Sequence, residues 1–328
     1  MRSLFDGFGR VRQAPWLVVG LWLSTVLLAL PLAVTLHGML GDHLGASLAA
    51  ETAASGVNFD WWNEFLAQAA GVGQSFVPAI IGFAAVIKNL SDLADAERLP
   101  LVIAAVVTAQ IVVSMFLAGG VFDRLARDRA IGASGFFQAC GVYFFRFLRL
   151  GVMAAAMYWL LFAIVHPWLF GRVYPWLTKD VTVERTAFFY RLALYVFFAI
   201  AVFKVNMVFD YAKVRAVVED RRSMIGALVA SLRFIWRNPW ATVGLYALNT
   251  VLFLIVIGLY ALTAPGASAN LLAFAVGQLY IVLRVMVRLQ FAASQISLFQ
   301  SRLAHAGYVA RPVPAWPDSP AAEALGPN

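Results

Sequence analysis

The sequence predicts an all-α fold, a polytopic bundle of about six transmembrane helices. Hydrophobic residues make up 62% of the chain and charged residues only 13%, whereas a soluble domain has roughly 45–50% and about 25%. The charged residues also fall in short clusters between long apolar runs. This pattern is typical of loops that alternate with membrane-spanning segments.

Six apolar windows have the length of a membrane span, close to the ~20 helical residues that cross a ~30 Å hydrocarbon core. They cover residues 15–36, 99–121, 150–170, 192–209, 240–262 and 271–289. The first window is too long for the apolar part of a signal peptide, so we expect an uncleaved span. Pro100 and Pro239 are expected in first helical turns and Asn238 at an N-cap.

The distribution of lysine and arginine predicts the orientation. If the N-terminus is cytoplasmic, the inner segments carry sixteen basic residues and the outer segments five. Because cytoplasmic loops carry an excess of Lys and Arg, both termini should be cytoplasmic. With the membrane domain at 1–306, a disordered tail rich in proline and small residues is expected at 307–328.

The long outer loop, residues 37–98, should contain short helices. Asp60 is a candidate cap for a helix that carries Trp61 and Trp62, both suited to a membrane interface. The apolar segment 76–87 is interrupted by Pro78 and too short to cross, which favours a re-entrant or interfacial helix; a seventh, tilted span is the alternative.

Two inner segments look alike. GFFQACGVYFFR begins at Gly135 and GALVASLRFIWR begins at Gly226, 91 residues later. The pattern is compatible with two parallel units, each made of a span, a cytoplasmic amphipathic helix and a second span. The alternative is that any inner helix needs aromatic residues toward lipid and arginines toward head groups.

No catalytic motif is present, so we expect a protein that is not an enzyme and that has no cofactor. Cys140 is the single cysteine, and His37 and His43 have no common ligand spacing, so no metal site is expected.

Polar residues inside spans are the candidate site, because burial of such groups in hydrocarbon is costly. They are Gln110, Lys204, Asn206, Asp210, Asn249, Arg284 and Arg288. In one interpretation the three cations extend to the inner head groups. In the other they line an inner vestibule, where they meet Asp123, Asp210 or an anionic ligand. Gln110 and Asn249 are expected to form interhelical hydrogen bonds.

The segment FDYAKVRAVVEDRRSMIGALVASLRFIWRNP, residues 209–239, is followed at once by a span. It resembles bacterial six-helix membrane proteins that include the membrane domain beside some glycerophosphodiester phosphodiesterases. The resemblance implies a membrane fold and no phosphodiesterase activity, since the chain has no room for that soluble domain.

The leading hypothesis is a multi-pass protein of the bacterial inner membrane that handles or senses a lipid or small solute. A secondary transporter and a scaffold for a partner complex are the alternatives. The expected partners are membrane lipids with anionic head groups at the cytoplasmic face. Nucleic acid is not expected, because the basic residues flank apolar spans.

Overall fold

The computed structural model describes residues 2–45, 47–55, 58–76, 83–97, 100–128, 131–264 and 270–303, which form helices and no strand. Six helical segments are long and apolar enough to span a membrane. Five of them are α2 (Pro15–Gly45), α6 (Leu101–Arg127), α10 (Glu184–Val218), α12 (Pro239–Thr263) and α13 (Asn270–Arg302). The sixth runs from Ala133 to Thr178. The predicted all-α polytopic bundle is confirmed.

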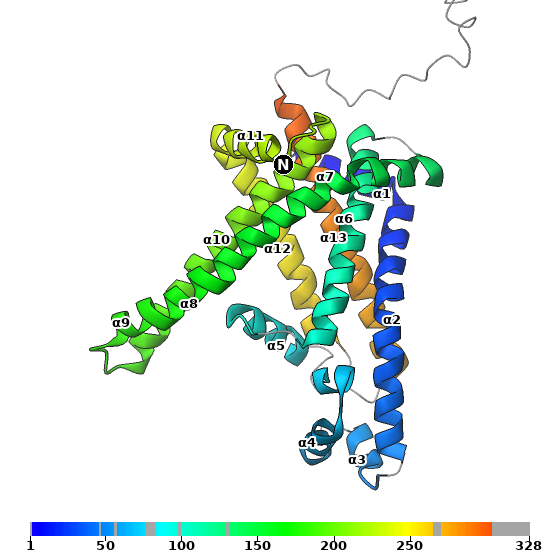
Figure 1. Ribbon diagram of the computed structural model, residues 1–328, viewed down its shortest axis with the longest axis vertical. Coiled ribbons are helices and arrows are strands. Elements are labelled where there is room, and N and C mark those ends of the chain that lie inside the picture. Colours follow the sequence, from blue (N-terminus) through cyan, green and yellow to red (C-terminus); the bar gives the residue numbers. More distant parts are fainter. Residues whose placement is uncertain are drawn as a thin grey trace, which may run out of the picture.

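The sixth segment is a continuous rod built from five pieces. They are α7 (Ala133–Trp159), a π-helix (Leu160–Val165), α8 (His166–Trp168), a second π-helix (Leu169–Val173) and α9 (Tyr174–Thr178). In Figure 1 this rod and α10 form a hairpin that inclines away from α2 and α13 toward α9. Both helices are therefore much longer than the predicted spans at 150–170 and 192–209.

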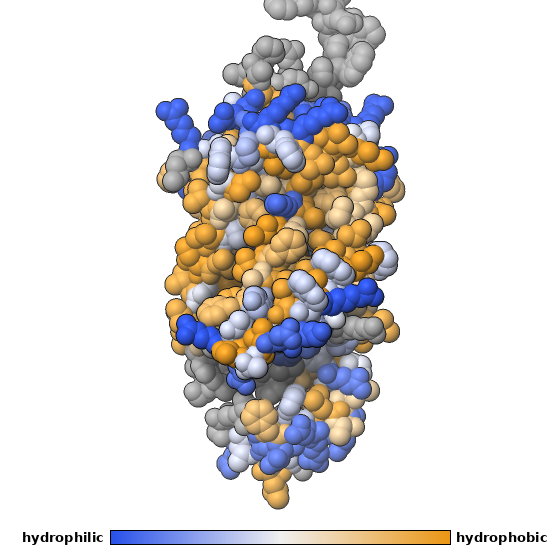
Figure 2. Space-filling model, turned by 90° about the vertical axis from the view of Figure 1, so that its left-hand side faces the viewer, coloured by the Kyte–Doolittle hydropathy of each residue, from blue (hydrophilic) through white to orange (hydrophobic). Residues whose placement is uncertain are grey.

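The outer surface of the bundle matches a bilayer. Figure 2 shows a hydrophobic band between two hydrophilic zones. Within the most apolar window of each span, between 0% and 22% of the residues are buried inside the protein. The apolar side chains of the band must therefore be covered by lipid, and the chain is a multi-pass membrane protein.

One end of the molecule, which we call the basic face, holds the N-terminus, helix α11 (Met224–Arg237) and the ends of α6, α10 and α13 (Figure 1). Helix α1 (Arg2–Arg12) packs there against α13. A Cβ atom on Gly7 would lie 2.9 Å from the backbone nitrogen of Ser294, so only glycine allows this close approach. The other end, the opposite face, holds α9 and the segment between α2 and α6.

That segment contains α3 (Ala50–Ser55), α4 (Phe59–Gln68), a 3₁₀ turn (Gly71–Ser75) and α5 (Phe83–Ala94). The expected cap was wrong: Asn58, not Asp60, accepts the backbone N–H of Trp61. Trp61 is also not an interfacial residue. It is buried, stacks on Phe65 and donates its indole N–H to His43. Of the predicted 76–87 segment, residues 77–82 lie outside the described residues, so the re-entrant helix and the seventh span both stay predictions.

The two similar inner segments adopt different structures. The first is the beginning of α7 and continues into its span without a break, whereas the second is the separate helix α11. Each follows a span end at which an aspartate has a positive φ, +48° for Asp128 and +47° for Asp220. The internal duplication remains a prediction, and the expectation of two separate inner helices was wrong.

Of the predictions about helix starts, the one for Pro100 needs correction, and the positions of Asn238 and Pro239 are confirmed. Pro100 is at the N-cap of α6 and not in its first turn. Asn238 stands at the N-cap of α12, with Pro239 next, but its side chain does not cap that helix. It donates instead to the carbonyl of Phe234 at 3.2 Å and so closes the end of α11.

Candidate functional site

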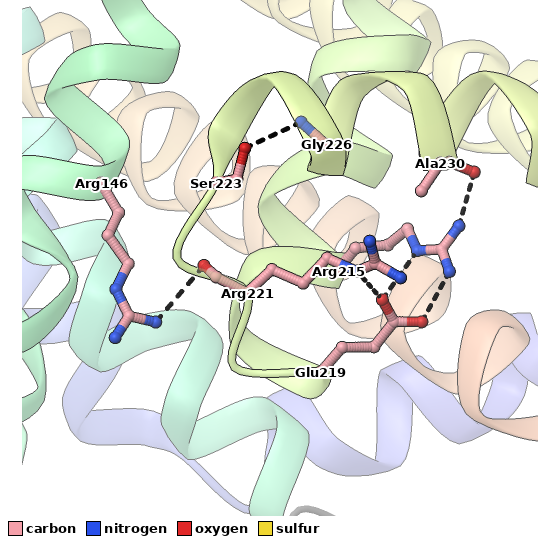
Figure 3. Close-up of polar contacts among 7 residues, drawn as sticks. All are labelled: Arg146, Arg215, Glu219, Arg221, Ser223, Gly226 and Ala230. Carbon is pink, nitrogen blue, oxygen red and sulfur yellow. Dashed lines mark hydrogen bonds and ion pairs between the residues drawn. The ribbon is translucent and has the colours of Figure 1, made fainter.

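The loop between α10 and α11 is fixed at both ends. Asp220, in the left-handed conformation that aspartate tolerates better than most residues, pairs with Arg146 of α7 at 2.5 Å. Ser223 caps α11 by accepting the backbone N–H of Gly226 at 3.2 Å. Figure 3 shows this contact, together with the guanidinium of Arg146 reaching the backbone carbonyl of Arg221. The start of α11 is thus held in a defined position.

Glu219 holds two arginines at the start of this loop (Figure 3). Its carboxylate accepts Nη2 of Arg215 at 2.6 Å and Nε at 3.1 Å, and it also accepts Nε of Arg221. Burial by itself raises the pKa of the Glu219 carboxyl, but the hydrogen bonds from the two arginines together outweigh it and hold the pKa below the ordinary value. Arg215 also donates to the carbonyl of Ala230, which links α10 to α11.

Beside this network lies a hollow of about 650 Å³ whose walls come from α10, α11 and the last turn of α13. We call it the arginine hollow. Its five arginines are Arg215, Arg221, Arg233, Arg237 and Arg302. Among the described residues, the last three have no carboxylate within 4 Å. The single carboxylate of Glu219 therefore leaves an excess of positive charge.

The hollow also has an aromatic part. Phe234 and Phe299 line it, with their ring centroids 5.0 Å apart. The guanidinium of Arg215 lies 5.2 Å from the centroid of the Phe299 ring, a cation–π contact that holds both groups in place. A ligand in the hollow meets guanidinium groups and apolar rings together.

Helix α11 presents one apolar side to the surroundings. Ile225, Val229, Leu232 and Trp236 recur at helical spacing and are all exposed, Trp236 at 80%. The other side of the helix, which includes Ala227 and Ile235, is buried against the bundle. A helix with an exposed apolar side and arginines beside it is typical of the membrane interface.

This arrangement is suited to anions that carry several oxygens. Guanidinium groups bind phosphate by paired hydrogen bonds, and Arg is preferred over Lys where this geometry matters. The volume lies within the range of small-ligand pockets, roughly 300–1,000 Å³. The hollow can therefore accept a phosphate-bearing head group.

Of the residues predicted from the sequence, Asp210 is at the centre of a polar cluster between α10 and α12. Its carboxylate accepts Lys213 Nζ at 2.9 Å and the hydroxyl of Tyr246 at 3.1 Å. One turn earlier on α10, Asn206 accepts the hydroxyl of Tyr158 from α7. The cluster joins three helices through hydrogen bonds inside the membrane-spanning part.

The two predicted amide groups differ in role. Asn249 is fully buried and donates to the hydroxyl of Ser294 on α13 at 2.9 Å, which confirms the expected interhelical hydrogen bond. Gln110 instead donates to Ser114 of its own helix at 3.5 Å. Its predicted interhelical bond is absent from the described residues.

The three predicted cations do not converge on one point. Lys204 is exposed on the side of α10 that also exposes Phe197 and Ile200. Arg284 and Arg288 lie one turn apart on α13, and neither has a carboxylate within 4 Å among the described residues. Arg288 is near enough to Asp210 for their charges to interact.

The arginine hollow was not found from the sequence. Its arginines were used there only to predict orientation. The usable signal was the repeated arginine of α11, Arg233 and Arg237, which places two guanidinium groups on one side of an amphipathic helix. Nothing in the sequence indicated that Arg302 joins them.

Comparison with protein-family models, with curated proteins and with solved structures found no match to this chain. The resemblance to the membrane domain found beside glycerophosphodiester phosphodiesterases therefore stays a prediction.

Proposed function

We propose that this chain is a bacterial inner-membrane protein that binds anionic phospholipid head groups of the cytoplasmic leaflet in the arginine hollow, and so handles or senses lipid without acting as an enzyme. The observation that carries the proposal is the hollow itself, where five arginines face one paired carboxylate. Anionic lipids supply the missing negative charge.

The position of the hollow supports a lipid ligand over a fully soluble one. The exposed apolar side of α11 belongs in the bilayer interface, and Trp240 at the start of α12 is 91% exposed beside it. The mouth of the hollow is therefore at head-group level. Its aromatic residues Phe234 and Phe299 can contact the glycerol or acyl part of the same molecule.

Lipid binding can be measured as thermal stabilisation of the purified chain in neutral detergent. We expect phosphatidylglycerol or phosphatidic acid to raise Tm and phosphatidylcholine to leave it nearly unchanged, because only a bound ligand stabilises the native state. Arg233→Gln/Arg237→Gln should remove most of the shift. The matched control is Arg172→Gln/Arg185→Gln, which removes two exposed arginines from the opposite face. Equal shifts in both double variants would rule out the hollow.

The orientation needs a separate test. We expect reporter fusions to place the N-terminus and the loop at Asp220 in the cytoplasm and the segment between α2 and α6 outside, because sixteen basic residues flank the inner ends of the spans against five at the outer ends. If a fusion places the Asp220 loop outside the cytoplasm, the hollow does not face the cytoplasmic leaflet, and that part of the proposal is wrong.

A further inference from the structure

Arg284 and Arg288 lie at the level of the second half of α12. Two contacts bracket them: Tyr280 stacks on Tyr260 at 4.1 Å, and Ser294 bonds Asn249 at 2.9 Å. Between those two partners, α12 reads TVLFLIVIGL. The two arginines are therefore at the level of a run that belongs in hydrocarbon.

Neither end of α13 is within reach of their side chains. At 1.5 Å per residue, Arg288 is about 21 Å and Arg284 about 27 Å from the helix end at Arg302, and similar lengths separate them from its start. The guanidinium of Arg284 lies 5.5 Å from the Tyr280 ring centroid. It thus points toward the start of the helix, away from the basic face. For Arg284, the interpretation that the side chain extends to the inner head groups does not fit this geometry.

Among the described residues, neither arginine forms an ion pair with a carboxylate. Both residues keep exposed surface, although neighbouring parts of the chain surround Arg288 closely enough to desolvate its charge in part. Asp210, whose charge acts on Arg288, is already bonded to Lys213 and Tyr246. An uncompensated cation at mid-membrane costs several kcal/mol, and such residues usually serve a ligand or an ion pathway.

The pair lies on α13, which also forms one wall of the arginine hollow, but is separated from the hollow. Tyr211, Phe234 and Phe299 form a chain of ring contacts at 5.4 Å and 5.0 Å, and Tyr211 is fully buried. Phe234 and Phe299 belong to the hollow, whereas Tyr211 adjoins Asp210. Asp210, Arg284 and Arg288 do not line the hollow, so an anion beside Arg288 occupies a different site.

We infer that Arg284 and Arg288 form a second anion site, inside the membrane-spanning part, that takes a phosphate group. Side chains four residues apart on a helix have Cβ atoms about 5–6 Å apart, which suits two guanidinium groups around one phosphate. The site goes beyond the proposed function, because head-group binding in the hollow does not require it. The phosphate can belong to a lipid or be free in solution.

The test isolates the deep site by working in the hollow variant Arg233→Gln/Arg237→Gln. Short-chain phosphatidic acid and inorganic phosphate are titrated separately against this full-length protein in neutral detergent, with thermal unfolding as the readout. We expect at least one probe to stabilise it. Adding Arg284→Gln/Arg288→Gln should weaken that binding about tenfold or more, since two charge-assisted contacts are lost. The matched control, Lys204→Gln, removes an exposed cation from the lipid side of α10 and should leave the binding unchanged.

Stabilisation by phosphatidic acid alone supports a lipid phosphate, and stabilisation by inorganic phosphate supports a soluble anion. Unchanged binding after the deep substitutions overturns the site, as does the absence of any stabilisation in the hollow variant. If the deep double variant does not fold, Arg284→Gln and Arg288→Gln are measured singly, and each should weaken binding. If the hollow does not bind lipid, the variant Arg233→Gln/Arg237→Gln should show the same lipid-induced rise in Tm as the parent protein. The deep substitutions should then abolish that rise.

Discussion

The hydroxyl of Tyr246 on α12 donates a hydrogen bond to Oδ2 of Asp210 on α10, 3.1 Å away. Tyr246→Phe removes this bond but keeps the ring against Phe203 and Phe291. Because the acceptor is a carboxylate, we expect the free energy of unfolding to fall by about 1.5–3 kcal/mol. Denaturant unfolding in detergent measures it. Tyr280→Phe is the control, since that hydroxyl has no hydrogen-bond partner among the described residues; equal losses would contradict the assignment.

The Asn249–Ser294 bond predicts an energetic coupling between α12 and α13. Both residues are fully buried and 2.9 Å separates the bonded atoms. In a double-mutant cycle of Asn249→Ala and Ser294→Ala, we expect a coupling of about 0.6 kcal/mol, and at most about 1.7 kcal/mol, as for other polar pairs in membrane bundles. Strictly additive losses would show that the bond adds no stability.

Glu219 predicts a pH-dependent contribution to stability. Its pKa lies below the ordinary value of 4.5, so the native state favours the charged form. The contribution is present above pH 4.5 and is lost as the pH falls through the lower native pKa. Glu219→Gln should cost about 1.5–3 kcal/mol at pH 7. The difference in the free energy of unfolding between the variant and the parent protein should become smaller below pH 4.5. Unfolding curves recorded from pH 7 to pH 3 measure it. The control is Asp180→Asn, at an exposed residue of the opposite face, which should have the same free energy of unfolding as the parent protein. If the loss of stability in Glu219→Gln stays constant with pH, the pairing of Glu219 with the two arginines is contradicted.

Gly119 predicts how closely α6 and α7 must pack. A Cβ atom there would lie 2.8 Å from the carbonyl oxygen of Ala139 and 3.0 Å from Cα of Cys140, both backbone atoms that cannot rotate away. We expect Gly119→Ala to lower the free energy of unfolding by about 1–3 kcal/mol. Gly244→Ala on α12 meets nothing within 4 Å and should be neutral or stabilising by up to about 1 kcal/mol. If thermal unfolding shows a lower Tm for Gly244→Ala than for Gly119→Ala, the close contact at Gly119 is refuted.

Hydropathy located the six spans because each apolar window is long enough to cross a bilayer by itself. It did not predict where the helices end. Helix α10 continues to Val218, well past the window that ends at 209, because its last turns are covered by neighbouring helices and no longer need to be apolar all round. Helix α1 was not predicted for a related reason. Its glycines and arginines are typical of a polar segment before a span, and the helix is stabilised by its packing on α13.

The candidate site was predicted only in part. Asn249 was found because a polar residue in an apolar run needs a partner, which is a local property of the sequence. The arginine hollow depends on Arg215 and Arg302, which are far apart in the chain and meet only when α10 packs beside α13. No spacing rule predicts that contact. The depth of Arg284 was likewise hidden, because the sequence does not state how α12 and α13 are aligned.

The packing of α1 on α13 has a consequence for biosynthesis. The amide of Gln290 donates to the carbonyl of Leu4 at 2.8 Å across 286 residues of sequence, and Arg10 reaches Gln300 across 290. At about 5–20 residues per second, roughly 15–60 s separate the synthesis of these partners. Helix α1 can therefore dock only after α13 has been synthesised. The basic face is completed only when α13 has been synthesised, so a chain interrupted before α13 lacks both the partner of α1 and one wall of the hollow.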